Sequence, residues 1–262
     1  MFIIIPVSIL TVLAILFGIL IAIFSKKFEV PTDQMVEDVL SNLSGANCGA
    51  CGYAGCEDFA NALVTGEASL ALCNATSKEG KLKIGELLGT DASILDTVVV
   101  CACNGGNLCE DKYSYQGYGD CKSVELLAGG RKTCPSGCIG MSTCVASCPS
   151  HAIEIIQGVA VVDNNKCTNC GVCILQCPKN IIKRIPADKY YYVACSTPLT
   201  GKNVRVNCKA GCIGCSICSK VCPEGAITMI NNLPVIDYTK CTNCGICASK
   251  CPAKCILKRS GK

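Results

Sequence analysis

The cysteines of this chain follow one spacing that recurs three times. Two residues separate each of the first three cysteines of a run, three residues precede the fourth, and a proline follows it; the runs begin at Cys167, Cys212 and Cys241. Three thiolates at this spacing wrap one corner of an iron-sulfur cubane, while the fourth points away and binds a second cubane. Zinc is the alternative, but zinc sites use two Cys-x2-Cys pairs rather than four cysteines followed by proline.

A shift of 74 residues superposes nine cysteines without a gap. The pairs are Cys121 with Cys195, Cys134 with Cys208, Cys138 with Cys212, Cys144 with Cys218, Cys148 with Cys222, Cys167 with Cys241, Cys170 with Cys244, Cys173 with Cys247 and Cys177 with Cys251. Each half also contains an apolar hairpin between its cysteine runs, over residues 152–163 and 226–237. The repeat therefore predicts a duplicated bacterial two-cluster ferredoxin.

The cysteine content also decides which other protein classes remain. The 262 residues include 27 Cys, one His and no Trp, so side chains for an ordinary apolar core are few. An odd number of cysteines excludes complete disulfide pairing, and a single His argues against Cys2His2 zinc fingers and imidazole catalysis. Coordination by thiolates alone remains. The formal net charge of +4 becomes about −8 with six clusters of about −2 each, and no nucleic-acid partner is expected.

One position breaks the repeat, because Cys215 corresponds to Met141 and the first half lacks that ligand. We expect Cys134 to replace it. If the ligands cross between runs as they do in ferredoxins, the two halves hold four 4Fe-4S clusters. The expected ligand sets are Cys134, Cys138, Cys144 and Cys177; Cys148, Cys167, Cys170 and Cys173; Cys212, Cys215, Cys218 and Cys251; and Cys222, Cys241, Cys244 and Cys247.

A fifth set precedes the repeat, in a loop where glycine and alanine surround the sulfurs. Its members are Cys48, Cys51, Cys56 and Cys73. We expect Cys56 to begin a helix over residues 57–65 and Cys73 to close the site after a turn at Gly66. A fifth 4Fe-4S cluster is predicted here, with a 2Fe-2S or zinc site as the alternative.

Seven cysteines lie outside these five sets, and we expect four of them to hold a sixth cluster. The expected set is Cys103, Cys121, Cys195 and Cys208, with Cys109 or Cys101 as alternatives to Cys103. The other possibility is that these are buried or free thiols, which is the expectation for Cys101, Cys109 and Cys255.

The amino-terminal segment predicts a membrane anchor. No charged residue occurs between Phe2 and Ser25, and 22 mostly apolar residues from Ile3 to Phe24 form about 33 Å of helix. Lys26 and Lys27 follow, so the positive-inside rule predicts a single pass through the cell membrane with the rest on the cytoplasmic side. A signal peptide is the alternative, but a charged leading region and a cleavage site are missing. A first cytoplasmic helix is expected after a cap at Thr32 or Asp33.

These expectations add up to an α+β chain. It has a single amino-terminal transmembrane helix, a small Gly- and Cys-rich 4Fe-4S domain, and duplicated bacterial-type 2×(4Fe-4S) ferredoxin-like units. The expected divisions are 1–27 for the transmembrane anchor, 28–90 for the amino-terminal 4Fe-4S domain, 91–133 for a Cys-containing connector, 134–186 for the first ferredoxin-like unit and 187–262 for the second.

Nearly the whole chain resembles the B subunit of the Rnf complex in its clostridial, cluster-rich form. The resemblance rests on the anchor, the Cys48 to Cys73 domain, the stretch from Tyr113 to Gly117, and the run from Cys134 to Pro149. It implies an electron-transfer subunit of an ion-translocating ferredoxin:NAD oxidoreductase, in which Na⁺ or H⁺ is the pumped ion. It also implies a soluble ferredoxin as electron donor, and the membrane, flavin and NAD subunits and the lipid bilayer as partners. No dinucleotide fingerprint is present, so this chain is not expected to bind NAD.

Two other functions share part of this pattern. An electron-transfer subunit of a hydrogenase, formate dehydrogenase or reductase complex would share the ferredoxin runs. It would not obviously share an anchor joined to the Cys48 loop. A protein that stores metal on thiolates is the non-redox alternative, and the regular Cys-Pro endings and hairpins argue against it.

Overall fold

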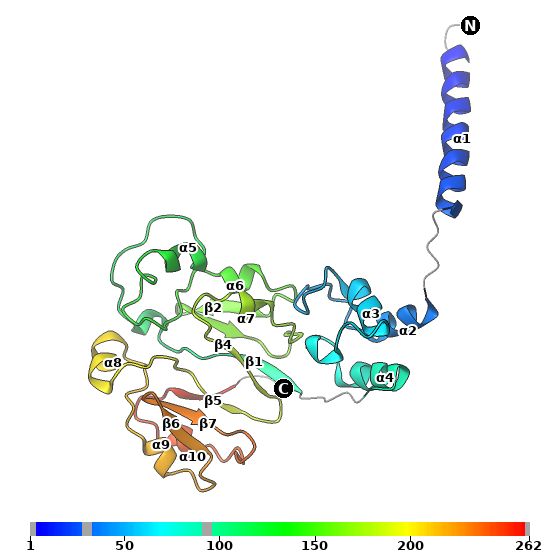
Figure 1. Ribbon diagram of the computed structural model, residues 1–262. Coiled ribbons are helices and arrows are strands. Elements are labelled where there is room, and N and C mark those ends of the chain that lie inside the picture. The colour runs from blue at the N-terminus through cyan, green and yellow to red at the C-terminus, as the bar shows by residue number, and fades with distance from the viewer. Residues whose placement is uncertain (1–3, 28–32, 91–95, 260–262) are drawn as a thin grey trace.

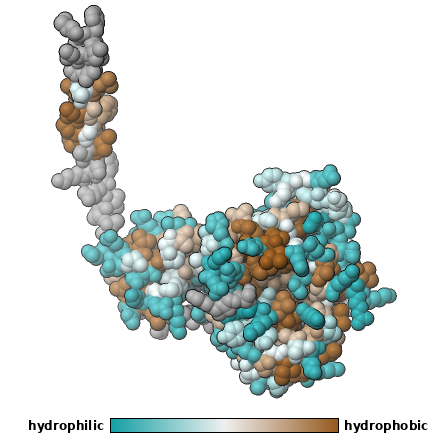
Figure 2. All heavy atoms as spheres, turned by 180° about the vertical axis from the view of Figure 1, so that it is seen from behind, coloured by the Kyte–Doolittle hydropathy of each residue, from teal (hydrophilic) through white to brown (hydrophobic). Residues whose placement is uncertain are grey.

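The computed structural model describes residues 4–27, 33–90 and 96–259. Helix α1 (Ile4–Lys27) stands apart from the rest of the chain (Figure 1), and its side chains, described without a break from Leu10 to Ile21, are all exposed (Figure 2). Within the described residues, no helix is both long and apolar enough to cross a membrane. The membrane span predicted for residues 1–27 is therefore not found among them.

A small helical domain follows, over residues 33–90. Its elements are α2 (Gln34–Asn42), α3 (Cys56–Val64), the 3-10 turn η1 (Leu70–Leu72) and α4 (Lys78–Leu88). The predicted cap is confirmed, because the Asp33 carboxylate accepts a hydrogen bond from Met35 N at 3.1 Å. Val39, Phe59 and Ile84, one from each α-helix, are at most 1% exposed and form the centre of the core.

The first ferredoxin-like unit contains two strand pairs. Its elements are β1 (Thr97–Cys101), η2 (Gly106–Leu108), α5 (Cys121–Leu126), α6 (Thr143–Ala146), β2 (Ile153–Ile156), β3 (Val159–Val162), α7 (Val172–Gln176) and β4 (Ile182–Pro186). β2 and β3 form the hairpin expected over residues 152–163. β1 pairs antiparallel with β4, with Val99 opposite Arg184. The expected connector 91–133 therefore supplies a strand to the first unit, because its Val-rich run completes a two-stranded sheet.

The second unit repeats this plan. Its elements are β5 (Tyr191–Val193), α8 (Gly201–Asn207), α9 (Ile217–Lys220), β6 (Ile227–Ile230), β7 (Leu233–Ile236), α10 (Ile246–Ser249) and β8 (Ile256–Lys258). β6 and β7 form the second predicted hairpin, and β5 pairs antiparallel with β8. Figure 1 shows the two units against each other, with α2 to α4 at one end of the first.

The strands reveal a correspondence that the 74-residue shift does not contain. Ala102 N donates to the Ile181 carbonyl at 2.6 Å, and Ala194 N donates to the Cys255 carbonyl at 2.7 Å. Ile181 and Cys255 are 74 residues apart, whereas Ala102 and Ala194 are 92 apart. In space β1 therefore corresponds to β5. The first unit carries 18 more residues than the second between this strand and the first cysteine run, which is the difference between 92 and 74.

Candidate iron-sulfur cluster sites

Each cysteine run closes on a short helix in the same way. The residue before α6, α7, α9 and α10 is in the left-handed conformation, with φ between 58° and 86°. This turn places the third cysteine of the run in the first turn of the helix, at Cys144, Cys173, Cys218 and Cys247. At Gly171 and Gly245 the residue is glycine, which adopts this conformation without strain. In the three complete runs, at α7, α9 and α10, local sequence alone thus places three thiols around one space.

The Cys48 loop forms a cavity in the helical domain. All four predicted ligands line it, together with Phe59 and Leu72. Cys56 is the first residue of α3, and Asn47 Oδ1 accepts a hydrogen bond from its backbone N at 2.8 Å. The amino end of a helix favours a thiolate over a thiol. Thr76 Oγ1 lies 3.2 Å from Cys73 Sγ on the opposite side of the site.

This cavity faces the first ferredoxin-like unit. Cys170 of that unit also lines it. Burial raises the pKa of the Cys48 thiol, and the sulfur of Cys170 adds to the rise. The amino-terminal set and one set of the first unit are therefore neighbours in space.

The second unit brings both of its predicted sets together. Burial raises the pKa of Cys218 to about 11, and burial also raises the pKa of Cys247. The sulfurs that add to the first shift are those of Cys212, Cys215 and Cys251, and those that add to the second are Cys244, Cys241 and Cys222. In both cases the fourth ligand comes from the other run, which is the crossing that the sequence predicts.

The structure also brings the members of one predicted set of the first unit close together. Burial raises the pKa of Cys173 to about 12, and the sulfurs that add to this rise include all three predicted partners, Cys167, Cys170 and Cys148. Cys148 Sγ accepts a hydrogen bond from Ala152 N at 3.3 Å. Its repeat partner Cys222 accepts the equivalent bond from Ala226 N, also at 3.3 Å.

The other set of the first unit differs from the expectation at one ligand. Burial raises the pKa of Cys144 to about 12, and the sulfurs that add to this rise are those of Cys138, Cys121, Cys177 and Cys173. Cys121, Cys138, Cys144 and Cys177 also line one cavity, beside Cys101. Cys121 thus lies where the repeat predicts Cys134. It begins α5, and its backbone N donates to Thr143 Oγ1 at 2.7 Å, which fixes α5 against α6.

The four cysteines of the expected sixth set do not lie together. Three of its members, Cys103, Cys195 and Cys208, line a cavity between the two units, whereas Cys121 lies in the cavity just described. Cys109 and Cys134 take part in this second cavity instead. The sequence predicts Cys109 as a spare thiol or as an alternative to Cys103. Its placement depends on the inserted segment, for which the repeat offers no partner.

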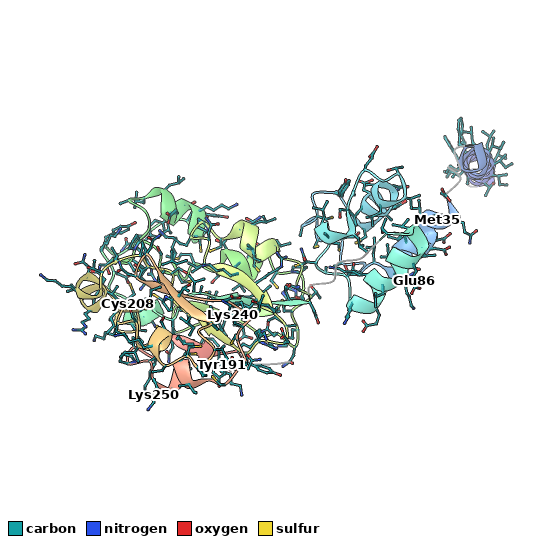
Figure 3. The ribbon with its side chains drawn as sticks, turned by 60° about the horizontal axis from the view of Figure 1, so that its bottom comes forward. Met35, Glu86, Tyr191, Cys208, Lys240 and Lys250 are labelled. Atoms are coloured by element: carbon teal, nitrogen blue, oxygen red, sulfur yellow. The ribbon has the colours of Figure 1, made fainter. Side chains whose placement is uncertain are left out.

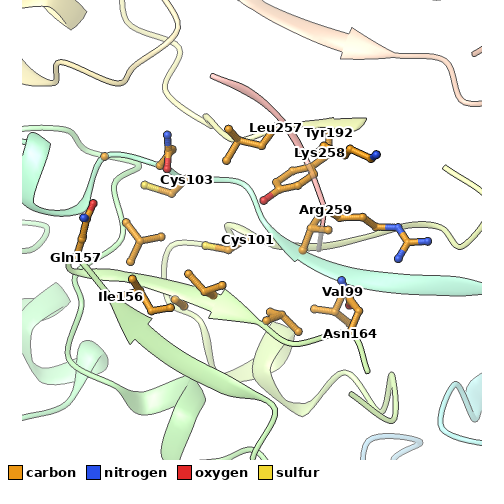
Figure 4. A pocket seen from close by; sticks show the side chains of 17 residues that line it. Val99, Cys101, Cys103, Ile156, Gln157, Asn164, Tyr192, Leu257, Lys258 and Arg259 are labelled. Carbon is orange, nitrogen blue, oxygen red and sulfur yellow. The ribbon is translucent and has the colours of Figure 1, made fainter. Parts of the chain in front are cut away.

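Two further cysteines lie outside every set. Cys101 is buried in the core of the first unit and lines a larger cavity between the units, together with Cys103 and Tyr192 (Figure 4). Cys255 Sγ lies 3.6 Å from Cys251 Sγ and is 1% exposed. A hydrogen bond from the Cys255 thiol lowers the pKa of Cys212 to about 6 and raises that of Cys255 itself.

The donor chemistry of these sites fits iron-sulfur clusters. Each set consists of thiols only, and in the described parts of the chain no three His, Cys, Asp or Glu side chains converge closely enough for a single metal ion. A cubane needs a wider arrangement, because each thiolate binds a different iron atom.

Comparison with protein families agrees with these sites. Residues 43–74 match the family described as "Putative Fe-S cluster", residues 211–255 match the 4Fe-4S dicluster domain, and residues 160–183 match the 4Fe-4S binding domain. The chain therefore binds multiple 4Fe-4S clusters.

Curated relatives extend the likeness to most of the chain. The B subunit of the ion-translocating oxidoreductase complex of Methanosarcina acetivorans is 38% identical over 237 residues, which cover 89% of this chain and 90% of the relative. This chain belongs to the family of B subunits of ion-translocating oxidoreductase (Rnf) complexes. The B subunit of the Na⁺-translocating ferredoxin:NAD⁺ oxidoreductase complex of Acetobacterium woodii is 40% identical, covering 91% of this chain and 72% of the relative.

A third relative carries a different ion in its name. The B subunit of the proton-translocating ferredoxin:NAD⁺ oxidoreductase complex of Clostridium ljungdahlii is 34% identical, covering 87% of this chain and 82% of the relative. Membership of this family confirms the predicted resemblance. It also makes this chain an iron-sulfur subunit of a multi-subunit, membrane-bound redox complex rather than a metal store.

Proposed function

We propose that this chain carries electrons from a reduced soluble ferredoxin to the membrane and flavin subunits of its complex, which pass them on to NAD. The observation that carries the proposal is that the thiol sites are neighbours, from the Cys48 cavity through both sets of the first unit and again within the second unit. When bound, a 4Fe-4S cluster supplies a one-electron carrier at each site. Five sets hold 20 of these cysteines: Cys48, Cys51, Cys56 and Cys73; Cys148, Cys167, Cys170 and Cys173; Cys121, Cys138, Cys144 and Cys177; Cys212, Cys215, Cys218 and Cys251; and Cys222, Cys241, Cys244 and Cys247.

Side-chain placement gives the series an order. Cys170 lines the Cys48 cavity, which joins the amino-terminal set to the first unit. Cys173 acts on the pKa of Cys144, which joins the two sets of that unit. The backbone donors Ala152 and Ala226 favour the extra negative charge that a reduced site carries, because each donates to a ligand sulfur.

The electron donor is expected at the second unit, because sulfur reaches the surface there. Cys215 and Cys244 are the two exposed cysteines among those described, and they belong to the two different sets of this unit. A carrier protein that docks at either of them would approach a cluster site closely.

The charge of the second unit supports an acidic donor. Residues 187–262 contain 11 Lys and Arg residues and three Asp and Glu residues, a net charge of +8. Residues 134–186 contain four Lys and Arg residues and two Asp and Glu residues, a net charge of +2. Two clusters of about −2 each leave the second unit near +4 and the first near −2. Opposite charge steers a carrier to the correct surface and raises its association rate.

The repeat locates this extra charge next to the cluster sites. Lys220, Lys250 and Lys254 are exposed, and the residues 74 positions earlier are Ala146, Gln176 and Asn180. Lys220 ends α9, and the other two flank the last ligand of the run at Cys251. The two units therefore differ in charge at otherwise matching positions, which favours docking at the second.

Electrons are expected to leave from the Cys48 site toward the membrane. This site belongs to the helical domain that follows α1 in the chain. The described side chains of α1 itself are mostly apolar and exposed. From the uncharged, apolar sequence of residues 2–25, we expect the whole segment 1–27, rather than the described part of α1 alone, to attach the chain to the cell membrane in a single pass, with Lys26 and Lys27 and the cluster-binding units on the cytoplasmic side. Resistance to extraction by alkaline carbonate, lost when residues 1–27 are deleted, tests this attachment.

The electron-transfer proposal is tested by composition and by one variant. Anaerobically purified full-length protein should contain iron and acid-labile sulfide at about four of each per site; zinc without sulfide would refute the proposal. In the assembled complex, Cys51→Ser should lose most ferredoxin-dependent NAD reduction. Cys101→Ala, at a buried cysteine outside every set, is the matched control. Unchanged NAD reduction in Cys51→Ser would contradict the assignment of the Cys48 site as the exit.

A further inference from the structure

One short segment connects the two ferredoxin-like units. On one side, Glu110 N donates to the Asn207 carbonyl and Lys209 N donates to the Leu108 carbonyl, both at 3.0 Å. On the other side, Lys112 N donates to the Arg131 carbonyl at 2.7 Å and Thr133 N to the Glu110 carbonyl at 2.9 Å. Residues 108–112 therefore form a strand-like link between 207–209 of the second unit and 131–133 of the first.

This link brings three thiols together. Cys109 lies opposite Cys208 in an isolated antiparallel bridge, and the two pack with Cys134 in a small buried cluster. The Cys109 sulfur is in hydrogen-bonding contact with the sulfurs of both Cys134 and Cys208. Cys208 ends α8 and is labelled in Figure 3. Cys134 and Cys208 are repeat partners, so they approach the same point from the two units.

Two cysteines are candidates for the fourth ligand beside Cys109, Cys134 and Cys208. Cys103 and Cys195 correspond in space, because Cys138 N donates to Cys103 Sγ at 3.4 Å and Cys212 N donates to Cys195 Sγ at 3.3 Å. The geometry favours Cys103. A Cβ placed on Gly105 would lie 3.0 Å from Cys208 Sγ and 3.8 Å from Cys103 Sγ, so both sulfurs border the same space.

A buried lysine holds the segment beside this space in place. The side chain of Lys132 is buried, and its Nζ donates to the Cys109 carbonyl at 3.1 Å and pairs with Asp111 at 3.0 Å. Lys132 thus fixes the segment that carries Cys109. Six cysteines of the described chain line the cavity and none of them forms a disulfide, so the thiols here outnumber the four that a cubane needs.

We propose that Cys103, Cys109, Cys134 and Cys208 hold a further 4Fe-4S cluster that bridges the two ferredoxin-like units. The inference rests on the proposed electron-transfer function. The site adjoins Cys138 of the first unit directly and Cys212 of the second through Cys195. It therefore fills the interval between the two halves of the series. One electron from the second unit would reduce it, and the same electron would pass on to the first.

Iron and acid-labile sulfide counts on the anaerobic full-length protein test this site. The wild type should contain about 24 of each, whereas five sites alone give about 20. Cys109→Ala and Cys134→Ala should each lose about four iron atoms per chain and keep about 20. Cys195→Ala is the matched control, since it borders the same cavity from the equivalent position, and it should keep about 24.

The outcomes separate this inference from the proposed function. A wild type with about 20 iron atoms, or a Cys109→Ala variant with as much iron as the wild type, would overturn the bridging site and leave the five-site relay intact. Loss of about four irons in Cys195→Ala and not in a Cys103→Ala variant would overturn the proposed fourth ligand. Absence of sulfide from the wild type would overturn the relay itself. If the alanine variants do not fold, the wild-type count alone decides between about 20 and about 24.

Discussion

Neutralising three lysines of the second unit should slow its reaction with an acidic ferredoxin. The change is Lys220→Ala with Lys250→Gln and Lys254→Asn, which gives the second unit the residues that the first unit has at the matching positions. All three side chains are exposed in the described structure, so their removal leaves the core and the thiol sites in place. The expected effect is therefore on encounter with the partner rather than on cluster content.

Coulomb's law gives the size of the effect. One pair of unit charges about 6 Å apart in water contributes about 0.7 kcal/mol, so three pairs contribute about 2 kcal/mol, or about 30-fold in rate at low salt. Screening reduces this contribution, because the Debye length falls from about 30 Å at 0.01 M salt to about 3 Å at 1 M. The variant and the wild type should therefore differ by about 10- to 30-fold at low ionic strength and by less than about twofold in 1 M salt.

Stopped-flow mixing of the cluster-loaded protein with reduced ferredoxin measures the second-order rate constant. The matched control replaces three exposed lysines elsewhere, Lys78, Lys83 and Lys122, with glutamine, which changes the net charge by the same amount. The control should keep a rate close to that of the wild type. Equal slowing in both triple variants, or a rate difference that persists in 1 M salt, would refute docking at the second unit.

Three further predictions concern single residues. Phe59→Ala should destabilise the helical domain by about 3–5 kcal/mol, because Phe59 is 1% exposed and its ring centroid lies 5.4 Å from that of Tyr53. Hydrogen exchange of α2 to α4 would measure this loss of stability, and unchanged protection of their amides would contradict the prediction. Arg259→Met should destabilise the second unit by about 1.5–3 kcal/mol, because the guanidinium donates to the Ala187 carbonyl at 2.6 Å and to the Lys189 carbonyl at 2.9 Å. An unchanged midpoint of denaturant unfolding would contradict this loss of stability. Cys121→Ala should lose about four iron atoms, and retention of all iron would restore Cys134 as the ligand of that set.

Local sequence was sufficient for much of the site. The three-residue spacing of each complete run, with its left-handed residue and short helix, places three thiols around one space whatever the rest of the chain does. The hairpins and the Asp33 cap were likewise predictable, because alternation of apolar residues and capping chemistry act over a few residues. The crossing of the fourth ligand followed from the repeat, since both units close in the same way.

Only the tertiary structure decided where Cys109, Cys121 and Cys134 belong. In the sequence, Cys121 matches Cys195 at 74 residues, yet in space the partner of Cys195 is Cys103, from a strand 92 residues earlier. The 18 extra residues of the first unit, the difference between 92 and 74, separate these two alignments. Their path depends on hydrogen bonds with the second unit and on the contact of α5 with α6, which no local pattern encodes. The sequence by itself determined that the chain carries clusters and how most ligands are grouped, because those contacts are short in the chain. The ligands at the junction are set by long-range contacts, and these form only when the two units fold against each other.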